Sequence, residues 1–145
     1  MKPTYTKLIL QDSELIAVPS DYAERHELVR VEIPLLAQPI IVAAYALPSK
    51  AYKAGIAAAE KHAIYGRSMR APTPEEAFLI CDRSQFPALP KLYFPDIEEA
   101  PWTWTSQPYA ARSGAAWVVY LVNGDASWYG HDDLCQVRAV CAGQS

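Results

Sequence analysis

The feature that most restricts the fold is the dipeptide Asn123-Gly124, which separates two runs of β-prone residues. Asn-Gly is the strongest short hairpin signal, because a two-residue type I′ turn needs positive φ angles at both central positions. Just before the first run, Trp and Thr alternate as they do in a strand with one buried face. The C-terminal part is therefore predicted to be an antiparallel meander. Its strands are expected at residues 102–106, 115–122, 126–129 and 136–141.

The N-terminal part also reads as strands, because short β-prone runs alternate with turn-forming residues. Gln11, Asp12 and Ser13 separate the first two runs, so a hairpin is predicted there. The last run is apolar throughout, which is typical of a strand buried on both faces. These strands are expected at residues 6–10, 14–18, 28–33 and 40–47.

The best-marked helix start in the chain lies at Thr73. A hydroxyl at the N-cap, a proline at N1 and Glu76 at N3 form the pattern of a capping box. The helix is predicted to run to about Asp82, with Phe78 on its apolar stripe.

A second helix is predicted over the alanine-rich residues 50–64, with Ser49 as its cap and Gly66 as its stop. Residues 83–101 contain four prolines, which forbid a long helix or a central strand, so this segment is expected to be irregular.

The 145 residues suit a single domain, 1–145, with N-terminal strands at 1–47 and a core at 48–142. A net charge of −3 leaves no broad basic field for phosphates, so no nucleic-acid partner is expected. The sequence shows neither a secretory signal nor an apolar run near the ~20 residues that cross a bilayer, so no membrane partner is expected.

Four ordered segments resemble the motifs of one known family. The first, Gly-Arg-Ser-Met-Arg-Ala-Pro-Thr-Pro-Glu-Glu, is similar to its Gly, Trp-Arg-Leu-Pro-Thr, Glu signature, although Met69 stands where the family has Trp and Ala71 where it has Leu. The others are similar to its Trp-Ser-Ser strand, its tryptophan-bearing hairpin and its closing Val-Arg-x-Val strand. These segments are residues 66–76, 104–106, 116–124 and 137–140.

The family is the domain of unknown function 1566, which includes the C-terminal domain of the Legionella collagen-like adhesin and small phage proteins. The resemblance implies an α+β, C-type-lectin-like fold: two helices packed on a twisted antiparallel sheet, here with extra N-terminal strands. Such a fold hosts binding and catalysis alike, so it does not decide function. The location expected is the cytoplasm of a bacterial host, or a virion.

No metal site and no cofactor are expected. Gln107-Pro108-Tyr109 lacks the carboxylate that a lectin-type calcium site needs. His131-Asp132-Asp133 has no second ligand pair at zinc spacing and is interpreted as a polar turn.

The three cysteines, Cys81, Cys135 and Cys141, are interpreted as buried thiols, because an odd number argues against a disulfide framework. On one extended strand, Cys135 and Cys141 would also lie about 20 Å apart, too far to bridge.

Aromatic residues concentrate in the C-terminal meander and predict a protein-contact surface beside the long irregular loop. Trp128 and Tyr129 are adjacent on a strand and point to opposite faces, so one of the two is expected to be exposed. The predicted core residues are Trp104, Trp117 and Arg138, with Arg138 packed on one of the two indoles. The predicted contact residues are Tyr93, Phe94, Asp96, Trp102, Tyr109, Trp128, Tyr129 and His131.

The function expected is that of a non-enzymatic binding module, a phage or prophage accessory protein that recognises a host or virion protein, including a host defence factor. One alternative is a carbohydrate-binding, lectin-like domain. Another is an enzyme on the formylglycine-type scaffold. A third is a homo-oligomer assembled through the N-terminal strands.

Overall fold

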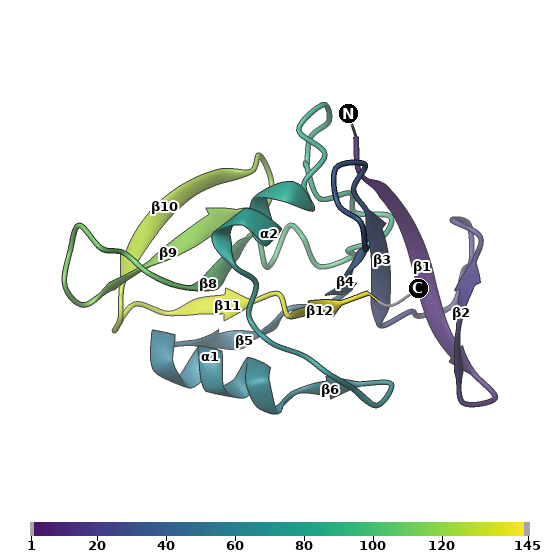
Figure 1. The fold of residues 1–145 in the computed structure, drawn as a ribbon, viewed down its shortest axis with the longest axis horizontal. Coiled ribbons are helices and arrows are strands. Elements are labelled where there is room, and N and C mark those ends of the chain that lie inside the picture. Colours follow the sequence, from purple (N-terminus) through teal and green to yellow (C-terminus); the bar gives the residue numbers. More distant parts are fainter. Residues whose placement is uncertain (1, 144–145) are drawn as a thin grey trace.

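The computed structural model describes residues 2–143 and has a mainly β architecture (Figure 1). Among those residues, the strands form four antiparallel sheets, and two short helices are the only α-helices. The expected α+β, C-type-lectin-like arrangement, with two helices packed on one twisted sheet, is therefore wrong. The strands divide between a five-stranded sheet, a three-stranded sheet and two strand pairs.

The five-stranded sheet combines the N-terminal strands with the last strand of the chain. Its first hairpin turns at Asp12 and Ser13, whose φ angles of 51° and 67° are those of a type I′ turn. The hairpin predicted at this point is confirmed. In spatial order the strands are β12 (Val140–Ala142), β4 (Ile40–Ala43), β3 (Leu28–Glu32), β1 (Thr4–Gln11) and β2 (Glu14–Val18).

The three-stranded sheet confirms the hairpin predicted at Asn123-Gly124, but its turn is wider than a type I′ turn. Tyr120 pairs with Asp125, and Gly124 alone of the Asn-Gly pair has a positive φ angle, 82°. The Gly124 N–H donates to the Tyr120 carbonyl over 2.7 Å, which closes an i to i+4 turn. The strands, in order, are β10 (Asp125–Gly130), β9 (Ala115–Tyr120) and β8 (Trp102–Pro108).

The strand predicted over residues 136–141 is broken in two at Arg138. The backbone N–H of Arg138 donates to the side-chain oxygen of Thr103 over 2.9 Å and not to a neighbouring strand. The run predicted over 40–47 is also interrupted, because the first strand there ends at Ala43 and the next begins only at Leu47. The strands on either side of the two breaks pair separately, so the expected single sheet is divided. The pairs are β11 (Cys135–Val137) with β5 (Leu47–Lys50), and β12 with β4.

Helix α1 (Tyr52–Lys61) packs against the β11–β5 pair and against β8, on the side of the three-stranded sheet that carries Trp104 (Figure 1). Gly55 allows this approach, because a Cβ at that position would lie 3.2 Å from Cδ1 of the Trp104 indole. The prediction that Ser49 caps this helix is wrong. The helix begins after Ala51, and Ser49 lies in β5.

The predicted end of the α1 region is also different. Gly66, with a φ angle of 79°, lies in the turn of a small hairpin formed by β6 (Ala63–Ile64) and β7 (Arg67–Ser68). Neither helix within residues 2–143 is both long and apolar enough to cross a membrane.

Helix α2 (Pro74–Leu79) packs over the other face of the three-stranded sheet, where Ala77 joins the same core cluster as Val119. Its predicted capping box is confirmed. The Thr73 hydroxyl accepts from the Glu76 N–H over 3.1 Å, and the Glu76 carboxylate accepts from the Thr73 N–H over 2.9 Å.

The irregular segment predicted over residues 83–101 is confirmed, since it contains neither helix nor strand. It nevertheless supplies much of the core, because its apolar side chains fill the space between the two larger sheets. The largest core cluster joins β3, β4, α2, β9 and this segment. Its fully buried members include Val29, Val31, Val42, Ile80, Leu89, Phe94, Ile97 and Leu121.

Candidate functional site

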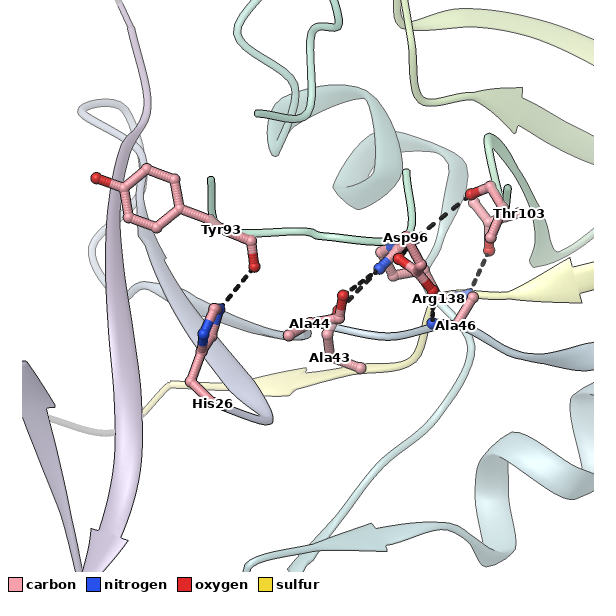
Figure 2. A network of polar contacts seen from close by, with 9 residues as sticks. His26, Ala43, Ala44, Ala46, Tyr93, Asp96, Thr103 and Arg138 are labelled. Atoms are coloured by element: carbon pink, nitrogen blue, oxygen red, sulfur yellow. Dashed lines mark hydrogen bonds and ion pairs between the residues drawn. The ribbon is translucent and has the colours of Figure 1, made fainter. Parts of the chain in front are cut away.

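The irregular segment is fastened to the core by an ion pair between Asp96 and Arg138 (Figure 2). Nη2 of Arg138 lies 2.7 Å from Oδ1 of Asp96, and Oδ2 of Asp96 accepts from the Ala46 N–H over 2.8 Å. Nη1 of Arg138 donates to the Ala44 carbonyl over 2.8 Å. Arg138 is completely buried, and burial lowers the pKa of its guanidinium, whereas the Asp96 carboxylate raises it.

Arg138 therefore packs differently from the prediction. Its guanidinium carbon lies 5.5 Å from the centre of the Phe94 ring, not on an indole. Phe94 is itself fully buried, so it offers nothing to a partner. The carbonyl of Tyr93 is 2.7 Å from Nε2 of the buried His26. Tyr93, Phe94 and Asp96, which were predicted as contact residues, thus hold this segment inside the molecule.

Trp102 and Tyr129 lie on the α1 side of the three-stranded sheet. Their rings are 5.5 Å apart, and Tyr129 meets the buried Trp104 edge to face at 5.9 Å. His131 follows β10 and stacks on Tyr52 of α1, with ring centres 4.7 Å apart. All three predicted contact residues are half-buried and already engaged with neighbouring rings.

Tyr109 and Trp128 lie on the opposite side of that sheet. Their rings stack at 5.7 Å, and the guanidinium of Arg112 lies 4.6 Å from the centre of the Trp128 ring. Trp117, predicted as core, is half-buried and packs edge to face on Tyr109. The eight predicted contact residues are therefore distributed over three separate places.

The structure gathers other apolar side chains around α2, and these form a feature that sequence reasoning missed. Their exposed fractions range from 39% for Leu36 to 79% for Phe86, with Leu35 at 75% and Phe78 at 45%. Three short stretches of chain supply them: the loop between β3 and β4, the helix itself, and the loop that follows it. We call these four side chains, Leu35, Leu36, Phe78 and Phe86, together with the half-buried Leu79, the α2 patch.

The α2 patch surrounds a series of hollows that share their walls. The first, of about 380 Å³, lies between Leu35 and Phe78 and has Lys2 and Arg83 at its border. A second, of about 440 Å³, continues from Arg83 to Phe86. The guanidinium of Arg83 lies 4.8 Å from the centre of the Phe78 ring, so a cation borders the apolar floor of the first hollow. The second hollow is more polar, because Ser84, Gln85, Asn123 and Asp125 also line it.

Asp82, the nearest carboxylate, is not available to a ligand. Its oxygens accept from the Ser84 hydroxyl over 2.6 Å and from the Gln85 amide over 2.9 Å. These hydrogen bonds lower the pKa of Asp82, chiefly the one from Ser84. The other charges at the border of the first hollow are Lys2 and Arg83, and Nη2 of Arg83 lies 3.7 Å from Oδ1 of Asp125 in an exposed ion pair.

Helical periodicity misled the interpretation of Phe78. The predicted stripe placed it against the core, but α2 is a single short helix that buries only Ala77. A weaker signal was present: Leu35 follows Pro34, and Phe86 precedes Pro87. Large apolar residues beside prolines lie in loops. A loop side chain is buried only where other parts of the fold cover it.

The three cysteine thiols belong to the interior of the protein. All three thiols are free and buried, and burial raises the pKa of Cys81 and of Cys135 to about 12. Burial also raises the pKa of Cys141. In the described part of the chain, no three His, Cys, Asp or Glu side chains converge as metal ligands would. Asp133 accepts from the Gly130 N–H, and His131 points to Tyr52.

No family model matches the chain, and no curated protein matches it.

Proposed function

We propose that the chain is a non-enzymatic protein-binding module whose contact surface is the α2 patch. The observation that carries the proposal is the concentration of exposed Leu and Phe side chains around shared hollows. Large exposed apolar side chains that form a continuous patch with a polar border are characteristic of protein-contact surfaces. The aromatic meander gives less support, since most of its rings already pack on one another.

The chemistry of the hollows selects the kind of partner. The apolar walls of the first hollow accept an aliphatic or aromatic anchor. Lys2 at its border favours a carboxylate beside that anchor, while Arg83 already pairs with Asp125. The partner under this proposal is a protein segment that presents an apolar side chain next to an acidic residue. The resemblance to a family with small phage proteins adds a host or virion protein, including a host defence factor, as the class of partner.

The lectin-like and enzyme alternatives have less support. A sugar-binding site needs an exposed aromatic face, and the Trp128 ring is already contacted by Tyr109 and Arg112. A formylglycine-type enzyme needs an activated, accessible thiolate, whereas burial raises the pKa of each thiol here.

Site-specific photo-crosslinking tests the proposal. A photo-reactive amino acid replaces Phe86 or Leu35 in the patch, or Leu134 as the control, which is 68% exposed and lies between β10 and β11. We expect one bacterial or virion protein to crosslink from both patch positions and not from position 134. Equal crosslinking from all three positions would contradict the proposal.

Binding of the purified partner provides the quantitative test. Phe86→Ser and Leu35→Ser should weaken binding by about tenfold or more, the usual effect of losing an apolar anchor. Leu134→Ser should leave the affinity unchanged. Patch variants that bind as tightly as the wild type would reject the α2 patch, and binding to a glycan array in place of a protein would favour the lectin alternative.

A further inference from the structure

The five-stranded sheet ends in an unpaired edge. Strand β2 is last in the strand order, and Figure 1 shows no element beyond it. The other edge is different, because the backbone of Arg70 exchanges two hydrogen bonds with Val140 of β12. A free edge presents backbone donors and acceptors that can pair with another strand.

The hairpin geometry shows which backbone groups point outward from β2. A two-residue type I′ turn makes Gln11 and Glu14 a hydrogen-bonded pair, and such pairs alternate along an antiparallel ladder. Glu14, Ile16 and Val18 therefore direct their N–H and C=O groups toward β1. Leu15 and Ala17 direct theirs outward. Within residues 2–143, the structure gives the Leu15 and Ala17 N–H groups no backbone partner.

The same alternation can be checked across the sheet. If the alternation of hydrogen-bonded pairs continues from β1 through β3, it predicts a hydrogen bond between Glu27 and Ala44. The structure has this bond, from the Ala44 N–H to the Glu27 carbonyl over 2.9 Å. The outward direction of Leu15 and Ala17 therefore follows from a ladder without a slip between these strands.

We propose that β2 pairs with β2 of a second copy of this chain, antiparallel and centred on Ile16. In this register Leu15 lies opposite Ala17 of the second copy, and Ala17 lies opposite its Leu15. Each pair joins two residues with outward groups, so all four N–H groups find a carbonyl. The turn at Asp12 and Ser13 and the missing N–H of Pro19 limit the pairing to this short stretch.

The side chains suit the same register. Two Ile16 side chains meet at the two-fold axis, where a non-hydrogen-bonded pair brings Cβ atoms closest. The one charged residue of β2 is Glu14, and it lies opposite Val18 of the second copy. The two Glu14 residues are then about 13 Å apart along the strands, beyond the screening length in physiological salt. Proteins usually protect a free edge with a lysine, a proline or a bulge inside the strand, and β2 has none of these.

Amide hydrogen exchange tests the proposal residue by residue. The Leu15 and Ala17 amides should exchange fast in dilute protein and slowly in concentrated protein, since they bond only in the dimer. The Ile16 and Val18 amides, which bond to β1, should be protected at every concentration and serve as the internal control. Fast exchange at Leu15 and Ala17 at all concentrations would overturn the pairing.

Sedimentation of matched variants tests the interface. Ala17→Pro removes one outward N–H per chain and leaves the ladder to β1 intact, so the dissociation constant of the dimer should rise about one hundred-fold, roughly tenfold per lost hydrogen bond. Ala17→Ser keeps the N–H and should dimerise like the wild type. Ile16→Lys, which places two ammonium groups at the two-fold axis, is the second variant if proline disrupts the hairpin. A wild-type chain that stays monomeric, or dimers unaffected by both Ala17→Pro and Ile16→Lys, would refute the proposal.

Discussion

Arg138 and Asp96 are 42 residues apart in the sequence, yet their side chains meet at 2.7 Å inside the protein. The pair connects the irregular segment before β8 with the junction between β11 and β12. Asp96 also accepts from the Ala46 N–H, so the junction between β4 and β5 belongs to the same connection.

We expect Asp96→Ala to lower the free energy of unfolding by about 3–5 kcal/mol, because it leaves a buried guanidinium without its counter-charge. Arg138→Met should also destabilise the protein. The double variant should lose clearly less than the sum of the two single losses, since no buried charge remains. Urea unfolding of the four proteins measures the coupling, and additive losses would show that the pair is not coupled.

The sequence was sufficient for elements whose causes are local. The capping box of Thr73 and Glu76 and the turn at Asp12 and Ser13 depend on residues within a few positions of one another, and both were predicted. The Arg138 contact depends on residues far along the chain, so the break it makes in the expected strand could not be predicted. That break is the reason why the single-sheet fold was wrong.

A second prediction concerns His26. Burial lowers the pKa of its imidazole below the ordinary 6.5, and the nearby Lys7 adds to the shift, against the hydrogen bond to the Tyr93 carbonyl. As the pH falls through 6.5, the unfolded chain takes up a proton before the folded one, so stability decreases until the pH passes below the folded pKa. His26→Gln can retain a donor to that carbonyl and does not titrate. Its thermal midpoint should depend less on pH in this range, and identical pH profiles would contradict the assignment.

A third prediction concerns the capping box. Burial alone would raise the pKa of Glu76, but hydrogen bonds from Arg70 at 2.6 and 2.8 Å, together with the Thr73 N–H, bring it below its ordinary 4.5. This contribution to stability is present above pH 4.5 and is lost as the pH falls through the folded pKa.

Glu76→Gln should therefore flatten the loss of stability in acid, while Thr73→Ala should cost about 1 kcal/mol. The stability lost in Thr73→Ala should be similar at neutral pH and in mild acid. This separates the contribution of the helix cap from the effect of protonating Glu76. Acid unfolding curves of both variants, followed by circular dichroism, provide the measurement. A Glu76→Gln curve as steep as that of the wild type would show that Glu76 does not control this transition.

A fourth prediction concerns the thiols. Because burial raises the pKa of Cys81 and Cys135 to about 12, neither forms much thiolate at mildly alkaline pH. Iodoacetamide should modify these two cysteines only in the unfolded protein, so the rate of modification should rise as denaturant unfolds the chain. Mass spectrometry of the folded and unfolded protein measures the difference. Rapid modification of one thiol in the folded protein would instead revive the enzyme alternative.

The candidate site was less predictable than the fold. Aromatic enrichment suggested the meander, but Tyr109, Trp128 and their neighbours use their rings on one another. The exposed residues of the α2 patch come from two loops and one helix, and no regular sequence spacing relates them. Only the packing of the irregular segment beneath α2 determines that Phe78 faces outward while Phe94 faces inward.

Gly55 of α1 faces the Trp104 indole at a distance that leaves little room for a methyl group. The sizes of the side chains that fit at positions 55 and 104 therefore depend on each other. In descendants or relatives of this chain, a larger residue at position 55 should be accompanied by a smaller ring at position 104. Substitution at either site alone should be rare.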